Sequence, residues 1–233
     1  AASDVYKRQE WAALRASGAV ASAERCDTSE ILHIRRLVAP MSSIAGVWHA
    51  AGVLADAVLA KQDAPALGRV YAPKVHGACS LQSAFTVTPL AAFALFSSVA
   101  ALLGGAGQAN YSAANACLDA LSVCLRSQGG CGVSVQWGAW AEVGMAARGA
   151  AGERMAAMEA ASGFGRIRLA QGLSALGLAV RQSMPAVLGV VPVAWSRFLG
   201  DGAPVPALLS AFAPKARGVR AVGVVGVRAA SGA

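Results

Sequence analysis

Residues 90–115 read LAAFALFSSVAALLGGAGQANYSAAN, and this stretch decides the fold. Its first part, residues 90–98, is an apolar run of strand length that ends in two serines. After a glycine-rich interruption, residues 110–126 have the spacing of a helix. A helix places positions i and i+4 on one face, so the phenol of Tyr111 and the amide of Asn115 point the same way. Because buried polar groups need partners, this pair predicts a working surface and not a core.

The alternation of strand and helix extends in both directions from this stretch. Further strands are predicted at residues 19–27, 44–52, 133–138 and 186–195. Helices are predicted up to Gly18, at residues 31–39, at residues 63–83, and twice within residues 151–182 on either side of GFG. Apolar strands that alternate with helices indicate an α/β fold, a doubly wound parallel sheet with helices on both faces.

Small and polar residues follow several of the predicted strands. They are Asp27, Ala50 to Gly52, Ser97, Ser98 and the stretch from Trp137 to Trp140. In an open parallel sheet a ligand lies beyond the carboxyl ends of the strands. We therefore expect a binding site at this one edge of the sheet.

The composition argues against several classes of protein. The 233 residues are 56% hydrophobic and 14% charged, which is typical of a globular protein and not of a disordered chain. The net charge of +8 comes from singly scattered basic residues, without the aromatic side chains of a nucleic-acid-binding surface. The five cysteines form no CxxC pair, which indicates small reduced thiols and neither a disulfide framework nor a metal site.

One uncharged stretch, residues 89–109, is long enough to span a bilayer. Serines and glycines interrupt it, and neither a Lys/Arg cluster nor an aromatic belt flanks it. A buried strand followed by a loop and a helix fits this stretch better. The N-terminus also lacks the apolar segment of a signal peptide, so we expect a cytoplasmic protein, with a plastid location left open.

Four motifs, in this order and spacing, resemble those of a known family. They are GVWHAAGVLADA (46–57), PKVHGA (73–78), FSSVAALLGGAGQANYSAANACLDAL (96–121) and VQWGAWAEVGMAA (135–147). Together they resemble the ketoreductase domain of modular type I polyketide synthases, within the short-chain dehydrogenase/reductase superfamily. The resemblance covers about residues 10–198 and implies a Rossmann-like sheet and NADPH as cofactor. It also implies a β-ketoacyl substrate, carried on the phosphopantetheine of an acyl carrier protein in the same synthase.

The family's catalytic residues, carried over position by position, fall on Lys74, Ser98, Tyr111 and Asn115. Most short-chain reductases carry Tyr-x-x-x-Lys, whereas these ketoreductases have Asn in that position and bring the lysine from the preceding helix. The resemblance implies that Tyr111 donates a proton and that Lys74 lies between Tyr111 and the nicotinamide ribose. Ser98 would donate to the carbonyl oxygen, and Asn115 would hold the substrate or a proton-relay water. The chemistry agrees, because a phenol with a pKa of about 10 needs a nearby cation to act as an acid at neutral pH.

Each of these four residues also has a purely structural interpretation when it is taken alone. Tyr111 would be a half-buried helix tyrosine with a solvated hydroxyl, and Lys74 would be a surface lysine. Ser98 would bond to the backbone at a strand end, and Asn115 would be an amide on the surface of a helix. Their joint spacing favours the catalytic interpretation.

The resemblance gives cofactor-binding roles to residues outside the catalytic set. Asp27 resembles the acid that contacts the adenine, and its structural alternative is an N-cap of the next helix. Ala50, Ala51 and Gly52 resemble the turn that lets the backbone approach the cofactor, and their alternative is tight packing of strand against helix.

Three further residues resemble the substrate side of the family's site. Trp137 and Trp140 resemble the start of the lid over the substrate, although a core position is favoured for Trp137. Leu54, Ala55 and Asp56 resemble the LDD signature of reductases that form the D-configured alcohol, with Ala55 in place of the middle aspartate. Leu103 stands where the opposite group has a tryptophan. The structural alternative for Asp56 is a helix cap.

Two features of a complete reductase are missing from the sequence. No GxGxxG fingerprint follows a first strand, and the arginine that the family uses against the 2′-phosphate of NADPH is absent. We therefore expect a piece of a longer polypeptide that begins near the third strand and, by itself, binds NADPH weakly or not at all and is marginally stable. Residues 1–9 resemble translated adapter sequence, and residues 199–233 resemble an interdomain linker.

Two other functions compete with that of a β-ketoacyl reductase. One is a catalytically silent, ketoreductase-like half that scaffolds neighbouring domains. Such halves usually lack the tyrosine and the lysine, which are present here. The other is a stand-alone short-chain reductase that acts on a free metabolite, and the exchanged Lys and Asn and the WGAW segment argue against it.

Overall fold

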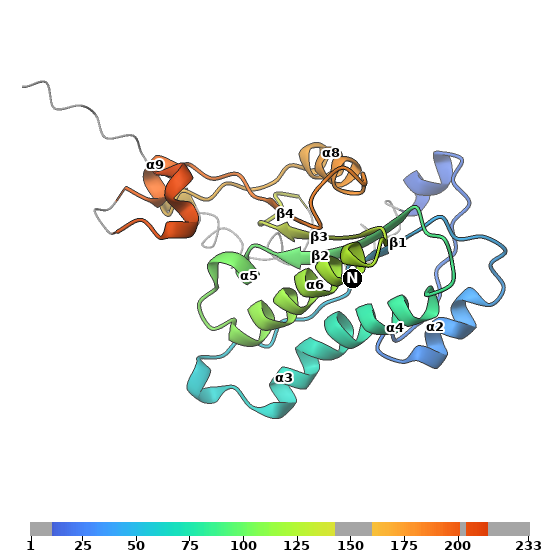
Figure 1. The fold of residues 1–233 in the computed structure, drawn as a ribbon. Coiled ribbons are helices and arrows are strands. Elements are labelled where there is room, and N and C mark those ends of the chain that lie inside the picture. Colours follow the sequence, from blue (N-terminus) through green and yellow to red (C-terminus); the bar gives the residue numbers. More distant parts are fainter. Residues whose placement is uncertain (1–10, 143–159, 201–203, 214–233) are drawn as a thin grey trace, which may run out of the picture.

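The computed structural model describes residues 11–142, 160–200 and 204–213. Four parallel strands form one sheet in the order β1-β2-β3-β4 (Figure 1). The strands are β1 (Gly46–His49), β2 (Ala92–Ser98), β3 (Gly132–Trp137) and β4 (Val187–Val190). Since the strands are parallel, their carboxyl ends lie at one edge, where His49, Ser98 and Trp137 each end a strand.

Helices cover both faces of this sheet, with α8 on one face and α3, α4 and α6 on the other (Figure 1). The α-helices are α2 (Ile31–Val38), α3 (Ala64–Tyr71), α4 (Gly77–Ala84), α5 (Ala100–Leu103), α6 (Ala109–Ser127), α8 (Leu169–Ala179) and α9 (Trp195–Phe198). The described residues also contain two 3-10 helices, η1 (Leu59–Lys61) and η4 (Ala207–Phe212), and one π-helical turn, η2 (Ala72–His76). Residues 11–16 are helical as well, ahead of Gly18, as predicted. The predicted Rossmann-like α/β fold, with helices on both faces of a parallel sheet, is confirmed.

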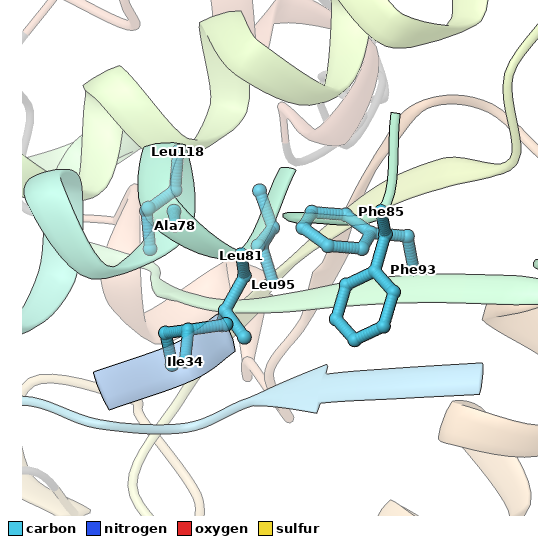
Figure 2. Packing of buried hydrophobic residues seen from close by; sticks show 7 residues of the cluster. All are labelled: Ile34, Ala78, Leu81, Phe85, Phe93, Leu95 and Leu118. Carbon is cyan, nitrogen blue, oxygen red and sulfur yellow. The ribbon is translucent and has the colours of Figure 1, made fainter. Parts of the chain in front are cut away.

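Two apolar clusters hold the helices to the sheet. The cluster under α2, α4 and α6 is shown in Figure 2 and consists of Ile34, Ala78, Leu81, Phe85, Phe93, Leu95 and Leu118. The cluster under α8 consists of Ala94, Val133, Val135, Trp137, Ile167 and Ala179. Alternate residues of β2 belong to different clusters, as expected for a strand that is buried on both faces.

The helix predicted at residues 63–83 is continuous but not uniform. Asp63 caps its start, because its side chain accepts a hydrogen bond from the backbone N–H of Ala66 (2.7 Å). Pro73 stands inside the helix, where it removes a backbone donor, and the chain there adopts the π-helical turn η2. This turn separates α3 from α4 and contains Lys74.

Two predicted strands need correction. Residues 19–27 form no strand, because a strand needs a neighbour for its backbone groups and the described residues place none beside this segment. The strand predicted at residues 186–195 ends at Val190, before Pro192, and Trp195 already begins α9.

Other predicted elements are confirmed or lie outside the described residues. The predicted helices at residues 31–39 and 110–126 are α2 and α6, and Gly129 follows α6 with a φ of +82°. Of the two helices predicted within residues 151–182, the second is α8. The first falls largely on residues 151–159, outside the described ranges.

The chain continues to pack beyond residue 198. The ring of Phe212 in η4 stacks on that of Trp195 in α9, with centroids 4.1 Å apart, and Leu209 is buried.

Among the helices of the described ranges, none has both the length and the apolar character that a bilayer crossing requires.

Candidate active site

Lys74 lies inside the protein and not on its surface. Only 3% of the residue is exposed, and its ammonium donates a hydrogen bond to the carbonyl oxygen of Phe96 on β2 (3.0 Å). Two neighbours shape this position. His49, the last residue of β1, donates from Nε2 to the backbone oxygen of Lys74 (3.0 Å). A Cβ on Gly52 would lie 3.0 Å from Cε of Lys74, so the absent side chain leaves room for the lysine.

Tyr111 lies in the first turn of α6, with its ring beside this lysine. The ammonium of Lys74 is 5.2 Å from the centroid of the ring, and Tyr111 is buried. Burial raises the pKa of the Tyr111 phenol, whereas the nearby polar side chains of Asn115 and Ser98 act to lower it. Tyr111 is therefore buried and not half-buried.

Asn115 is fully buried one helical turn after Tyr111, so it is not a surface amide. Its Nδ2 donates to the backbone oxygen of Tyr111 (2.8 Å), and its Oδ1 is buried without a hydrogen-bond partner. An orphaned buried acceptor is costly and calls for a donor from a water or a ligand. Ser98 is less enclosed, and its Oγ accepts a hydrogen bond from the backbone N–H of Ala100 (3.2 Å), as its structural interpretation predicts.

Burial strongly affects the charge of Lys74. It lowers the pKa of the ammonium to about 8, because a cation out of water loses its hydration, and the charge of Asp119 acts in the opposite direction. Asp119 was missed by the sequence analysis. Its signal was available, because Asp119 follows Asn115 at the same four-residue spacing that joins Tyr111 to Asn115.

A short strap, residues 55–57, is fastened to the start of α6. Its three anchors are hydrogen bonds from the Asn110 side chain to the Ala55 oxygen (2.9 Å), from the Ala57 N–H to the Gly107 oxygen (2.9 Å), and from the Gln108 side chain to Oδ2 of Asp56 (3.1 Å). Asp56 is thus held near Tyr111, whose pKa its charge raises. Asp56 does not cap a helix, because η1 begins after Val58 without a side-chain cap.

Asp27 lines an open groove of about 630 Å³ together with Arg25, Ala51 and Pro73. Pro73, the residue before Lys74 in the chain, lines this groove, whereas Lys74 and Tyr111 do not. The carboxylate of Asp27 accepts hydrogen bonds from the N–H (3.0 Å) and Oγ (2.7 Å) of Ser29, which lower its pKa. Asp27 is not the N-cap of α2, because the residue in that position is Glu30.

The two tryptophans lie on the other face of the sheet. Trp137 is buried in the cluster under α8, which confirms the core interpretation. The ring of Trp140 packs against that of Trp137 with centroids 4.9 Å apart, and the backbone of Trp140 forms an isolated parallel β-bridge with Ile167. The structure therefore does not bring Trp140 together with Lys74 and Tyr111.

The geometry unites a buried amine, a phenol and an amide at the carboxyl edge of the sheet. A phenol next to an ammonium can give up a proton, because the cation stabilises the phenolate that remains. A hydroxyl and an amide nearby can orient a carbonyl or a water. This set of groups suits proton transfer to a carbonyl oxygen.

Comparisons with known proteins point to one family. The KR domain family matches residues 1–142. Polyketide synthase GfsB of Streptomyces halstedii is 40% identical over 188 residues, which are 79% of this chain and 3% of that synthase. The phthioceranic/hydroxyphthioceranic acid synthase of Mycobacterium tuberculosis is 43% identical over 136 residues, 57% of this chain and 6% of that synthase.

Solved structures agree with these relatives. The ketoreductase from the first module of phoslactomycin biosynthesis in Streptomyces sp. HK803 is 35% identical, with a TM-score of 0.77 over 87% of this chain and 47% of that one. A structure of A-type ketoreductases from a modular polyketide synthase is 31% identical, with a TM-score of 0.79 over 87% of this chain and 43% of that one. The chain thus spans less than half of these ketoreductases and a small part of the synthases. It belongs to the KR domain family, the ketoreductase domains of polyketide synthases.

Proposed function

We propose that this chain carries the catalytic part of an NADPH-dependent reductase that converts a β-ketoacyl thioester to the β-hydroxyacyl form. The observation that carries the proposal is the buried ammonium of Lys74, 5.2 Å from the ring centroid of Tyr111. A protein that only scaffolded other domains would have no need to bury a lysine beside a tyrosine, because burial of the cation costs stability.

In this proposal Tyr111 is the acid. Its phenol gives a proton to the carbonyl oxygen of the substrate, and Lys74 stabilises the phenolate that is left. Ser98 donates a hydrogen bond to the same oxygen as negative charge develops there. To do so its hydroxyl hydrogen must point into the site, which is compatible with its oxygen accepting from Ala100.

Asn115 completes the proton path. Its unpaired Oδ1 is placed to accept a hydrogen bond from a water or from the substrate, next to both Tyr111 and the sheet. Such a water can resupply the proton that Tyr111 loses. This role supplies the missing partner of an acceptor that is otherwise buried and unsatisfied.

The groove lined by Asp27, Ala51 and Pro73 is the candidate for the part of the cofactor site that this chain supplies. Asp27 lines the groove, and its carboxylate can accept a hydrogen bond from an amine or a hydroxyl of the cofactor. Ala51 also lines the groove, and its small side chain leaves room for the cofactor. Gly52 and Lys74 would hold the part of the cofactor nearest to Tyr111. When bound, NADPH supplies the hydride that the carbonyl carbon needs, and the residues of this chain supply the proton.

Membership of the family supports an acyl carrier protein in the same polypeptide as the partner that delivers the substrate. The residues 54–56 favour the D-configured alcohol as product, although structural relatives include A-type ketoreductases. Chiral chromatography of the released β-hydroxyacyl product would assign this configuration.

The proposal can be tested in a chimaera, because this chain spans 47% of the phoslactomycin ketoreductase. Residues 10–213 would replace the matched segment, and oxidation of NADPH would be followed with a β-ketoacyl N-acetylcysteamine thioester. We expect turnover by the chimaera and a loss of about 100-fold or more in Lys74→Ala, with weaker NADPH binding. Lys61→Ala, at an exposed lysine, is the matched control. A folded but inactive chimaera, or a Lys74→Ala variant with the parental rate, would contradict the proposal.

A further inference from the structure

Asp119 is a residue of α6 whose carboxylate contacts β3, and the proposed mechanism gives it no role. Its Oδ1 accepts a hydrogen bond from Oγ of Ser134 (2.6 Å), and its Oδ2 accepts one from Nε2 of Gln136 (2.7 Å). Both partners are neutral donors on β3, so they fix the carboxylate in place without cancelling its charge. An acid held in this way is a fixed source of negative potential.

The register of the sheet places this charge at the level of Lys74. The ammonium of Lys74 bonds to the oxygen of Phe96, and Phe96 pairs with Val135 on the neighbouring strand. Ser134 and Gln136, which hold Asp119, flank Val135. Adjacent strands lie about 4.8 Å apart. The ammonium and the carboxylate are therefore anchored at matching positions on neighbouring strands.

Three titratable groups surround the lysine. Tyr111 faces it from α6, and His49 contacts its backbone from β1. Burial lowers the pKa of His49, so this histidine adds no positive charge at neutral pH. Asp119, also from α6, is the group whose charge favours the protonated lysine against the effect of burial.

We propose that Asp119 is a positioning residue that keeps Lys74 in its ammonium form, the form that the chemistry of Tyr111 needs. The role of Asp119 in catalysis rests on the proposed function. The effect of Asp119 on the pKa of Lys74, however, can be measured without any turnover. If the negative potential of Asp119 is removed, Lys74 becomes neutral at a lower pH. The phenolate of Tyr111 then loses its cation in the range where the reductase works.

The coupling can be measured by NMR on the 233-residue chain. Its lysines are Lys7, Lys61, Lys74 and Lys215, few enough to resolve their side-chain carbon signals, and Lys74→Arg assigns the signal of interest. We expect the pKa of Lys74 to be about 8 in the parent chain. In Asp119→Asn it should fall by about 0.5 to 1 unit. Asp119→Glu, which keeps the charge, should restore most of the difference.

Asp63→Asn is the matched control, because it removes the same charge from the exposed cap of α3 and should leave the pKa of Lys74 unchanged. If Asp119→Asn fails to fold, Asp119→Ser is the second neutral variant, since its hydroxyl can still accept a hydrogen bond. A folded neutral variant with an unchanged pKa of Lys74 would overturn the inference. Unfolding of both neutral variants would also overturn it, because Asp119 would then be a structural residue.

The chimaera separates this inference from the proposed function. In an active chimaera, Asp119→Asn should move the basic limb of the pH–rate profile to lower pH, by the shift seen in the NMR titration. A merely structural defect would lower the rate at all pH values. If the chimaera were inactive but the NMR shift were present, the proposed function would fail and the coupling of Asp119 to Lys74 would stand.

Discussion

The two faces of β2 and β3 differ: the face toward α8 is apolar, whereas the face toward α6 combines the apolar residues Phe93 and Leu95 with a group of polar side chains. Toward α8 the strands present Ala94, Val133, Val135 and Trp137. Toward α6 the strands present the polar side chains of Ser97, Ser134 and Gln136, which meet Asn115 and Asp119. We call these last five residues the polar layer.

The difference indicates a division of labour between the faces. Apolar burial stabilises the fold by about 25 cal/mol per Å² of surface removed from water, whereas a buried hydrogen bond contributes only about 1 kcal/mol net. The cluster under α8 and the cluster under α2, α4 and α6 therefore hold the sheet together. The polar layer contributes less to stability but fixes the positions of Lys74, Tyr111 and Asn115, so it holds the site.

The largest effect that would sharpen this contrast is expected for Tyr111→Phe. Loss of the phenolic proton should lower reduction by the chimaera about 100-fold or more, because nothing else in the site replaces the acid. NADPH binding should stay nearly intact, and the free energy of unfolding should change by less than about 1 kcal/mol. Tyr71→Phe, on α3, is the matched control and should keep the parental rate. Parental turnover by Tyr111→Phe would remove the tyrosine from its role as acid.

On the opposite face, Ile167→Ala should show the reverse pattern. Ile167 is fully buried under α8, and its truncation should cost about 3 kcal/mol of unfolding free energy through lost burial and the cavity that remains. Urea unfolding followed by circular dichroism measures this cost. Turnover under conditions where the chimaera is folded should change little. A larger effect on turnover than on stability would contradict the division between the faces.

Much of the fold, but only part of the site, could be predicted from the sequence. Apolar runs identified β2 and β3, because a strand buried on both faces needs apolar side chains along its length. The strand predicted at residues 19–27 was wrong, because apolar composition alone does not show whether a neighbouring strand is available for pairing. The end of β4 was placed too late because Pro192, which interrupts strand pairing, was not counted against the apolar run.

The site residues were predicted from their spacing in the sequence, whereas their burial was not predicted. Taken one by one, Lys74 and Asn115 suggested surface positions, yet both are buried. What buries Lys74 is the π-helical turn at Pro73 and the space beside Gly52, and neither can be recognised in a helical pattern. The i+4 spacing placed Asp119 on the face of Tyr111 and Asn115, but its contacts with Ser134 and Gln136 on β3 could be seen only in the structure.

Lys74→Met should reveal the cost of holding a cation in the site. Its pKa is lowered from 10.5 to about 8, so below pH 8 both the folded and the unfolded chain hold the proton and the folded state bears the cost of burial. Between pH 8 and 10.5 the unfolded chain binds more protons, and the free energy of unfolding should therefore rise with pH. At pH 7 the variant should be more stable than the parent by about 2 to 3 kcal/mol, and it should lack that rise.

Urea unfolding at pH 7 and pH 9.5 checks this prediction. Lys61→Met provides the control, because Lys61 is exposed and its replacement should leave the pH dependence unchanged. A parent chain whose stability does not rise relative to Lys74→Met between these pH values would show that the lysine is solvated.

The smallest effects are expected from two glycines of α8, which share one helix but differ in their surroundings. A Cβ on Gly172 would run into the ring of Trp140, whereas a Cβ on Gly177 would meet nothing within 4 Å. Gly172→Ala should therefore destabilise the fold by about 1 to 3 kcal/mol through overpacking. Gly177→Ala should stabilise it by about 0.5 to 1 kcal/mol, because alanine is the better helix former. Equal changes in the two unfolding midpoints would mean that Trp140 does not pack on α8, and the apolar face would then end at Trp137.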